Sequence, residues 1–319
     1  MNDIMLSVIC TTYGQEPYIR QALDSVLMQK VNFPMEVLIG EDCSPDNSRL
    51  ILEEYERKNP GFFTIIYRDK NIGATNNYYD LGIKAKGKYL AFLELDDFWT
   101  DCNKLQRQVD FLENNKQYYA VAAKTIIVDK TGRKKDEKYP EYFGKSYNWH
   151  HYLAWKLPGQ TATLVCRNFY QDNNELSVAL SKDTTLFPED RKWAFIFLCY
   201  GKVYCIPEVM SAYRHVCDEG YSYSACVRDY SLLAYYEDYT KFYKGILTYA
   251  YRYCKIKPII ISEKMYVKFN ICLKKNKGEK WLRYLVFNLD IHHKYRVLFF
   301  IIYKSIINIF KRIKITLHK

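Results

Sequence analysis

Three carboxylates follow an apolar run in the segment L93-E-L-D-D-F-W99. The run Tyr89-Leu-Ala-Phe-Leu93 is typical of a buried strand, and Glu94, Asp96 and Asp97 come directly after it. Clustered carboxylates repel one another and lose hydration, so a cation usually stands beside them. A divalent ion, Mg²⁺ or Mn²⁺, takes one or two carboxylates and completes its shell with phosphate oxygens and water. The alternative is a loop of solvated acids.

The elements that must position these acids form a regular alternation of short apolar strands and amphipathic helices. Strands are predicted at 6–10, 36–40, 62–67 and 89–93, each followed by a helical pattern, with Ser44 as the N-cap and Pro45 at the start of the second helix. This order predicts an α/β fold, a mostly parallel sheet with helices on both faces. Ligands of such sheets bind beyond the carboxyl ends of the strands, where polar clusters fall at 11–14, 41–44 and 94–97.

The second half of the chain is less regular. Residues 130–145 are charged and turn-like, 161–166 and 203–206 read as strands, and 193–200 read as a buried helix. From about residue 224 the pattern becomes helical and rich in Tyr and Lys. We therefore expect two parts, a sheet domain over 1–222 and a helical region over 223–319.

Cysteine usage and hydropathy bear on the compartment. The ten cysteines are scattered without a C-x-x-C pair, no run of 18 apolar residues occurs, and the first residues do not form a signal sequence. A reduced, cytoplasmic setting without a spanning helix is the expectation.

Taken together, several motifs resemble those of an inverting family 2 glycosyltransferase of the bacterial polysaccharide type. The resemblance covers about residues 5 to 222. It rests on S7-V-I-C-T-T-Y13, E41-D-C-S44, N71-I-G73, G87-K-Y-L-A-F-L-E-L-D-D97, F98-W-T-D-C-N-K-L-Q-R-Q-V-D-F-L112, P188-E-D190 and Y213-R-H215. It implies the Rossmann-like GT-A fold, and a metal-dependent transfer of a hexose-type sugar from a nucleoside diphosphate, UDP by preference.

The resemblance also implies roles for residues that bind the nucleotide-sugar. Thr11 and Tyr13 match positions that hold the base and ribose, and Asp42 matches an acid that accepts the imide N–H of the base. Glu41 belongs to the same site, although Asp is commoner in the family at its position. Asn71 and Asn77 match the approach to the diphosphate and sugar. The alternatives are a turn aromatic at Tyr13, a helix cap at Asp42, and turns or caps at the asparagines.

For the ion and the chemistry, Glu94 and Asp96 match the ends of the D-x-D motif of the family. Asp96 is the expected ligand of Mn²⁺ or Mg²⁺, Glu94 reaches the ion or the ribose, and Asp97 reaches the ion or the sugar. Asp190 matches the catalytic base, with Glu189 as the alternative. Both acids also suit a helix N-terminus.

The segment Y213-R-H215 resembles the loop that closes over the donor. Arg214 or His215 is expected to contact the diphosphate there, with His215 as a further metal ligand or a structural histidine.

The formal net charge is +11, and the segment from Lys294 to Lys319 holds seven Lys/Arg and no acid. Along it, the apolar residues fall on one helical face, opposite the basic residues. The residues of the apolar face are Phe299, Ile302, Tyr303, Ile306, Ile309, Phe310 and Ile313. This pattern favours a helix lying on an anionic membrane surface, at the inner face of the cell membrane. A helix packed on the protein is the alternative, and nucleic acid is not an expected partner.

The expected function is therefore glycosyl transfer to a saccharide or lipid-linked acceptor in cell-surface polysaccharide biosynthesis. Two alternatives stand beside it. One is a glycosyltransferase acting on protein or small molecules, and the other is a membrane-attached nucleotide-sugar-binding protein without catalysis.

Overall fold

The computed structural model describes residues 4–137, 139, 146–153, 156–171, 175–185 and 188–216, with Phe242, Gly245, Ile246, Tyr249 and Arg252. The chain divides into two compact units, Met1–Ala234 and Tyr235–Lys319, and the elements discussed below all lie in the first. The proposed boundary at 222/223 and the expected basic helix from residue 294 lie outside the described residues.

Strands and helices alternate along the first half as the sequence predicts. The order is β1 (Leu6–Thr12), α1 (Ile19–Leu27), β2 (Met35–Glu41), α2 (Ser48–Lys58), β3 (Phe63–Tyr67), α3 (Ala74–Lys84), β4 (Tyr89–Glu94), β5 (Phe98–Trp99) and α4 (Lys104–Asn114). It continues with β6 (Tyr118–Val128), β7 (Ser146–Tyr147), α5 (Trp149–Leu153), the 3₁₀ turn η1 (Thr161–Thr163), β8 (Val165–Arg167), α6 (Glu175–Lys182), α7 (Glu189–Tyr200) and β9 (Lys202–Arg214).

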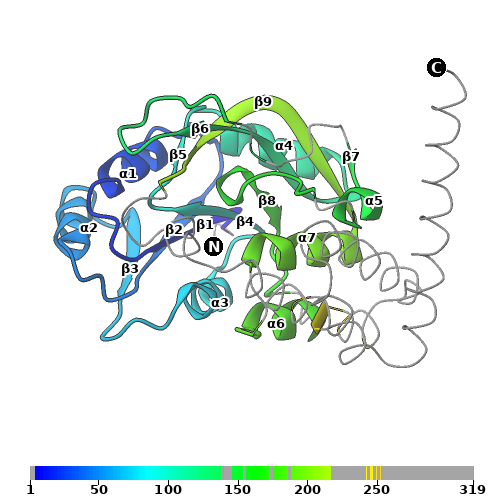
Figure 1. Ribbon diagram of the computed structural model, residues 1–319, viewed down its shortest axis with the longest axis horizontal. Helices are drawn as coiled ribbons and strands as arrows, with labels where there is room; N and C mark the ends of the chain where they lie inside the picture. Colours follow the sequence, from blue (N-terminus) through cyan, green and yellow to red (C-terminus); the bar gives the residue numbers. More distant parts are fainter. Residues whose placement is uncertain are drawn as a thin grey trace, which may run out of the picture. The chain divides into compact units, whose positions relative to one another are not determined.

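A nine-stranded sheet forms the centre of this unit (Figure 1), in the order β3-β2-β1-β4-β8-β6-β9-β5, with β7 also paired to β9. The four N-terminal strands run parallel, and β8 is antiparallel to both of its neighbours, β4 and β6. Parallel pairing returns between β6 and β9. The fold is thus α/β with a mostly parallel sheet, as predicted.

Alternate residues of the central strands face two different helical layers. Val8 and Cys10 of β1 and Leu93 of β4 belong to a buried cluster with α1, α2 and α4. On the other face, Phe92 of β4 stacks on Trp193 of α7 at 4.2 Å between ring centroids. Figure 1 shows α3, α6 and α7 together on one side of the sheet and α1 and α4 on the other. The strands are therefore buried on both faces, which explains their continuous apolar runs.

Two local predictions differ from the structure. Helix α2 begins at Ser48 with Asn47 at the N-cap, not at Ser44-Pro45. The Ser44 N–H donates to Glu41 Oε1 at 2.6 Å, and the Ser44 hydroxyl accepts from the Gly14 N–H at 3.1 Å, so Ser44 builds the preceding loop instead.

The predicted strand 161–166 starts instead with the 3₁₀ turn η1. The Gln160 side chain accepts from the Ala162 N–H at 2.7 Å, and the Thr163 hydroxyl donates to the Gln160 carbonyl at 2.6 Å. These side-chain contacts favour a tight turn over a strand.

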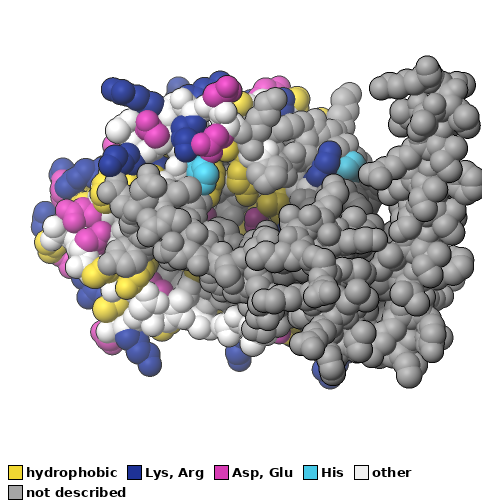
Figure 2. Space-filling model, viewed as in Figure 1, with side chains coloured by type: hydrophobic (Ala, Val, Ile, Leu, Met, Phe, Trp, Pro, Cys, Tyr) yellow, Lys and Arg dark blue, Asp and Glu magenta, His cyan; other side chains and the backbone are white. Residues whose placement is uncertain are grey.

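The surface over α1 and α2 mixes charges of both signs (Figure 2). Glu54 accepts from Arg20 at 2.6 Å and from Lys58 at 2.5 Å in this region. Exposed pairs of this kind add little to stability. Among the described residues over α1 and α2, the positive charge is therefore interspersed with acids rather than gathered into a basic patch.

A buried lysine stands out in the core. The Lys104 side chain is fully buried, its ammonium lies 4.6 Å from the centre of the Trp99 ring, and it donates to Gln108 Oε1 at 2.8 Å. Burial lowers the pKa of Lys104 to about 7. Between pH 7 and the ordinary lysine range, the unfolded chain therefore binds a proton that the folded chain does not, so this lysine makes stability rise with pH.

We expect Lys104→Met to remove that rise. The difference in unfolding free energy between wild type and variant should change by up to about 1.4 kcal/mol per pH unit between about pH 7 and pH 10. Urea unfolding at several pH values measures it, with Lys30→Met at an exposed lysine as the control. Parallel pH profiles for wild type and Lys104→Met would contradict the assignment.

Candidate active site

Three polar strand ends meet at one edge of the sheet. Strand β1 lies between β2 and β4, with Thr12 opposite Glu41 of β2 and Thr11 opposite Glu94 of β4. The chain remains paired just beyond the strands, where the Leu95 N–H donates to the Thr11 carbonyl at 3.0 Å and the Asp42 N–H to the Thr12 carbonyl at 3.1 Å. The segments 11–14, 41–44 and 94–97 therefore line one region at the carboxyl ends of the strands.

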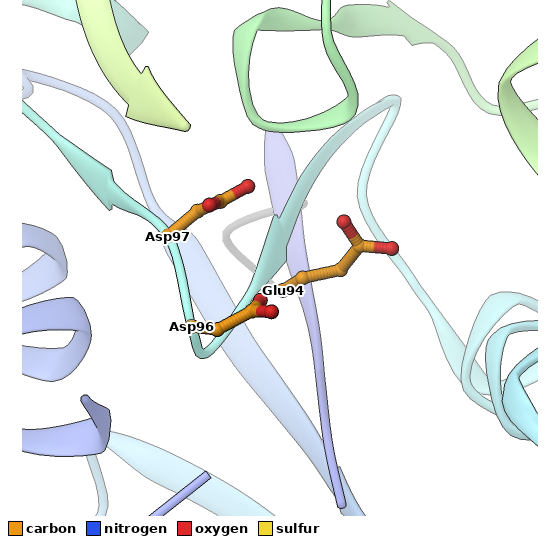
Figure 3. Close-up of side chains that lie close together, drawn as sticks. All are labelled: Glu94, Asp96 and Asp97. Atoms are coloured by element: carbon orange, nitrogen blue, oxygen red, sulfur yellow. The ribbon is translucent and has the colours of Figure 1, made fainter. Parts of the chain in front are cut away.

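The three carboxylates after β4 lie close together (Figure 3). One oxygen from each of Glu94, Asp96 and Asp97 lies within 4.8 Å of the others. Figure 3 shows Glu94 at the strand end and the two aspartates on the following turn, with all three side chains directed to the same side. Glu94 and Asp96 are half-buried, and Asp97 is buried.

Crowding and burial make these acids hard to ionise. Burial, followed by the charges of Asp96 and Asp190, raises the pKa of Glu94 to about 8. Burial likewise raises the pKa of Asp96 to about 6, against the opposing effect of backbone hydrogen bonding, Arg214 and Gln15. Ionising the whole cluster near neutral pH thus has a free-energy cost, and a bound cation would offset it.

The donor set suits a hard divalent ion. All three residues offer carboxylate oxygens, which Mg²⁺ and Mn²⁺ prefer. Oxygens bound on opposite sides of Mg²⁺ stand about 4 Å apart, close to the spread of this cluster. Glu94 and Asp96 are the members with exposed surface. They could hold such an ion and leave positions on it for ligand oxygens.

Asp97 has structural partners on both of its oxygens. Oδ1 accepts from the Arg214 backbone N–H at 2.7 Å, and Oδ2 accepts from Gln160 Nε2 at 2.6 Å. Burial, together with the charges of Asp96 and Glu94, raises the pKa of Asp97 well above its usual range. Asp97 thus joins the acidic turn to β9 and to the residue before η1, and its expected contact with the ion or sugar stays a prediction.

The Arg214 guanidinium is also engaged within the protein. It donates to the carbonyls of Asp96, Asp129 and Lys130 at 2.8–3.1 Å, and to Gln21 Oε1 at 2.7 Å. It also lies 4.4 Å from the centre of the Tyr18 ring. These contacts use four of the five N–H groups of the guanidinium, so Arg214 ties the acidic turn to the segments of Gln21 and Asp129. The expected contact of Arg214 with a diphosphate stays a prediction.

His215 lies outside the carboxylate cluster. Its Nδ1 is 2.6 Å from Glu137 Oε2, and its ring stacks beside Tyr213 with 6.0 Å between centroids. The structure therefore gives His215 a carboxylate partner on the neighbouring loop rather than a place among the candidate metal ligands.

The acids at the end of β2 hold the surrounding loops. Glu41 is fully buried and accepts two hydrogen bonds from Arg49, at 2.6 and 2.8 Å. Asp42 accepts the backbone N–H groups of Ile72 and Gly73, at 2.8 and 3.0 Å. Asp42 therefore caps the loop that leads into α3, a variant of the helix-cap alternative.

The two asparagines differ in exposure. Asn71 is exposed, and its Oδ1 accepts from the Gly73 N–H at 2.8 Å. Asn77 is buried and donates to the Gly40 carbonyl at 2.9 Å. A Cβ at Gly40 would come within 2.0 Å of Asn77 Oδ1, so only glycine allows this approach. Asn77 thus ties α3 to the end of β2.

The end of β1 provides the remaining nucleotide-site candidates. Thr11 is buried, and Tyr13 is half-buried in the bend that follows the strand. The hydroxyl of neighbouring Thr12 is buried and has no hydrogen-bond partner among the described residues.

Glu189 and Asp190 open α7, on the helix layer beside α3. Glu189 is buried and accepts from the Thr75 hydroxyl and from Lys192 Nζ, the latter at 2.8 Å. Asp190 is half-buried, and its Oδ1 is buried without a partner in the described part of the chain. Burial raises the pKa of Asp190, and its charge is one cause of the raised pKa of Glu94. Asp190 is thus electrostatically coupled to the acidic cluster.

Sequence reasoning missed several residues of this region. Gln160 donates a hydrogen bond to Asp97, and Gln15 lowers the pKa of Asp96 through a hydrogen bond. Tyr78 is buried, and no pattern in the sequence singles it out. Gln15 directly follows the polar end of β1, which was a usable signal. Gln160 and Thr75 lie far in sequence from their partners, so spacing could not reveal them.

Comparison with known proteins finds one matching family model and several similar chains. The family model described as "Glycosyl transferase family 2" matches residues 7–170. An uncharacterized protein of Mycobacterium tuberculosis (strain H37Rv) is 32% identical over 216 residues, 66% of this chain and 58% of that protein. The chain thus spans less than two thirds of the length of this relative.

Two further proteins are similar over different extents. The Escherichia coli UDP-Glc:alpha-D-GlcNAc-diphosphoundecaprenol beta-1,3-glucosyltransferase WfgD is 32% identical over 136 residues, 41% of this chain and 51% of that protein. The crystal structure of Staphylococcus aureus TarS 1-349 in complex with UDP-GlcNAc has a TM-score of 0.61 at 17% identity, over 92% of this chain and 78% of that chain. This likeness shows a shared fold, the expected GT-A fold.

The acidic cluster predicts how stability depends on pH. Since the pKa of Glu94 is raised to about 8, the folded chain binds a proton between about pH 4.5 and 8 that the unfolded chain has released. Stability of the metal-free chain should fall as pH rises through this window. Glu94→Gln should reduce the fall, by less than about 1.4 kcal/mol per pH unit because Glu94 is partly exposed.

Thermal unfolding between pH 5 and 8.5 measures this dependence, with Glu53→Gln on the exposed face of α2 as the control. Added Mn²⁺ should raise the melting temperature of wild type at pH 8 more than that of Glu94→Gln. Equal pH profiles for wild type and Glu94→Gln would refute the electrostatic account.

Proposed function

Since this chain belongs to glycosyl transferase family 2, we propose that it transfers a sugar from a nucleoside diphosphate donor, UDP by preference, to a hydroxyl group. The acceptor is a saccharide or lipid-linked saccharide. One observation carries this proposal: the polar ends of β1 and β2 and the carboxylates after β4 lie at one edge of the sheet, and the charge of Asp190 contributes to the raised pKa of Glu94.

The proposed donor site lies along the ends of β1 and β2. Tyr13 would stack on the base, with Thr11 beside it, since a tyrosine ring offers a flat face and a hydroxyl can satisfy a polar edge. Asp42 has both oxygens on backbone N–H groups, and each oxygen keeps a lone pair for the imide N–H of uracil. Asn71, exposed on the next loop, would approach the diphosphate.

Glu94 and Asp96 are the proposed holders of Mg²⁺ or Mn²⁺. When bound, such an ion neutralises charge on the diphosphate leaving group. Both side chains keep exposed surface, in contrast to Asp97, whose two oxygens already accept hydrogen bonds within the protein.

Asp190 is the proposed catalytic base. It would take the proton of the acceptor hydroxyl as that oxygen attacks the anomeric carbon and the bond from this carbon to the diphosphate oxygen breaks. A single displacement of this kind inverts the configuration at the anomeric carbon. A raised pKa suits the role, because a base works best when its pKa lies near the working pH.

The donor and acceptor classes draw support from similar proteins. The name of the Escherichia coli relative gives a UDP-sugar donor and a diphosphoundecaprenol-linked acceptor, and the Staphylococcus aureus structure holds UDP-GlcNAc. Cell-surface polysaccharide biosynthesis is the corresponding setting for this chain.

We expect Asp190→Asn to lower kcat by about 10² to 10⁴, since it removes the base and keeps the size of the side chain. Affinity for UDP in the presence of Mn²⁺ should stay within about threefold, because Asp190 makes none of the proposed contacts to the nucleotide or the ion. A panel of UDP-sugars, assayed for transfer and for donor hydrolysis, supplies the rates, and calorimetric titration with UDP supplies the affinity.

The same assay distinguishes an enzyme from a binding protein. Negligible turnover of every nucleotide-sugar by both wild type and Asp190→Asn, with UDP still bound, would favour the binding protein. Full activity of Asp190→Asn would instead remove this residue from the role of base.

For localisation, the proposal is peripheral attachment to the cytoplasmic face of the membrane through the basic segment 294–319. Of the helices in the described ranges, none combines the length and the apolarity needed to cross a bilayer. Each Lys or Arg near an anionic surface contributes about 1 kcal/mol, and the apolar face of the segment adds to this.

Deleting residues 294–319 should therefore abolish most binding to vesicles that contain anionic lipid, measured by co-sedimentation. Ile309→Glu on the apolar face should weaken binding more than Asn308→Glu on the polar face, since both add one negative charge and only the first removes apolar burial. Undiminished binding of the truncated chain would retire the proposed attachment.

A further inference from the structure

A buried polar chain joins the first turns of α3 and α7. The Thr75 hydroxyl donates to Glu189 Oε1, and Lys192 Nζ lies 2.8 Å from the same oxygen. Thr75 and Glu189 are 8% and 7% exposed, and the Lys192 side chain is fully buried. The Lys192 ammonium also donates to the Asp183 carbonyl at 3.2 Å. We refer to Thr75, Glu189 and Lys192 as the α3–α7 bridge.

On one side of this bridge, α3 is fixed to the proposed donor site. Asp42 accepts from Ile72 and Gly73 just before the helix, and Asn77 at the end of its first turn donates to the Gly40 carbonyl. Gly73 has a φ of 82°, which glycine adopts without strain. The start of α3 is therefore held at the end of β2 by three hydrogen bonds.

On the other side, the first turn of α7 is anchored through Arg191, which donates to the Tyr152 and Lys156 carbonyls at 3.0 and 3.2 Å, and through Lys192. None of these contacts involves the Asp190 side chain or reaches α3. Pro188 occupies the N-cap, and no side chain of the described residues caps this helix. Asp190 Oδ1 has no hydrogen-bond partner within those residues. The position of the Asp190 carboxylate therefore depends on where the helix backbone places it, and the adjacent Glu189 is what ties this turn to α3.

Aromatic packing holds the two helices together one turn deeper. The Tyr78 ring of α3 meets the Trp193 ring of α7 edge to face at 5.0 Å, and Trp193 stacks on Phe92 of β4 at 4.2 Å. Such packing brings the helices together, whereas the directional hydrogen bond between Thr75 and Glu189 fixes the first turn of α7 relative to α3. The bridge lies at the end where Asp190 stands.

From this geometry we propose that the α3–α7 bridge positions Asp190 against the donor site, and that Glu189 is a positioning residue rather than a second base. The inference rests on the proposed function. It assigns Thr75 and Lys192, which have no other role at the site, to the placement of the acceptor-side carboxylate. Glu189 is already committed to a hydroxyl donor and an ammonium, so its charge is compensated within the bridge.

Thr75→Val tests the bridge because it removes the hydroxyl and keeps the shape of the side chain. We expect kcat to fall about tenfold to a hundredfold, the scale of small misplacements of a reacting group, with KM for the donor within about twofold. Thr75→Ser, which restores the hydroxyl, should recover most of the activity. Thr64→Val, at an exposed threonine of β3, is the matched control.

Thr75→Val with wild-type kcat would overturn the inference. Equal losses in Thr75→Val and Thr75→Ser would overturn it as well, because the hydroxyl would then not be the operative group.

A second variant separates positioning from base catalysis. Glu189→Gln keeps an oxygen to accept from Thr75, and adding Lys192→Met removes the ammonium that would otherwise lose its counter-charge. We expect this double variant to lose far less activity than Asp190→Asn. A loss as large as that of Asp190→Asn would make Glu189 the base and overturn the inference.

Failure of the inference and failure of the proposed function give different results. If wild type transfers sugar from no nucleotide donor, the proposed function fails and takes the inference with it. If wild type transfers sugar and Thr75→Val matches it, only the positioning role of the bridge is lost.

Discussion

Mutual repulsion among the carboxylates after β4 is the constraint around which this site is built. One oxygen from each of Glu94, Asp96 and Asp97 lies within 4.8 Å of the others. Burial raises the pKa of all three, and the charge of Asp96 further raises the pKa of Glu94 and Asp97. The protein compensates for only part of this charge. Asp97 is satisfied by a backbone N–H and by Gln160, and the positive charge of Arg214 lies behind the turn. Glu94 and Asp96 are half-buried, and no cationic side chain among the described residues forms an ion pair with them. This imbalance favours a bound cation.

Much of the polar chemistry around the cluster serves to build loops. Glu41 fixes the loop after β2 through Ser44 and Arg49, and Asp42 holds the loop before α3. Asn77 needs the missing side chain of Gly40 to reach its carbonyl. A residue that matches a family motif can thus hold a loop and still present a free lone pair to a ligand. Asp42 keeps a lone pair on each oxygen while it holds the loop, and Arg214 keeps one N–H group beyond its four hydrogen bonds.

The parts predicted from sequence are those encoded by local patterns. Apolar runs bounded by polar clusters located β1 to β4, because buried parallel strands are apolar throughout. The strand–helix alternation then predicted a mostly parallel sheet, and ligand chemistry was expected at its carboxyl edge. Helix starts were less accurate, since Ser44 and Pro45 suit a cap but are drawn into a loop by Glu41 and Gly14.

The partners of individual side chains could not be predicted, because they come from distant segments. Arg214 meets Asp97 across 117 residues, His215 meets Glu137 across 78, and Thr75 meets Glu189 across 114. The periodic patterns of the sequence do not reveal such long-range contacts. The family resemblance gave positions near the site. It could not predict whether a cationic side chain such as Arg214 would contact a ligand or other parts of the protein.

The buried Glu189–Lys192 pair is difficult to explain by stability alone. Removing two charges from water is costly, and well-packed apolar residues often replace such pairs without loss of stability. The ion pair instead fixes the orientation of the Glu189 carboxylate, because the oxygen that accepts from Thr75 also contacts the Lys192 ammonium. A packed apolar contact would tolerate small rotations of α7 about its axis, and the carboxylate of Asp190 would move with them. The hydrogen bond from Thr75 to Glu189 crosses between the helices at the start of α7, next to Asp190, and resists that rotation. The Lys192 ammonium lies on α7 itself and holds the Glu189 oxygen that accepts this bond.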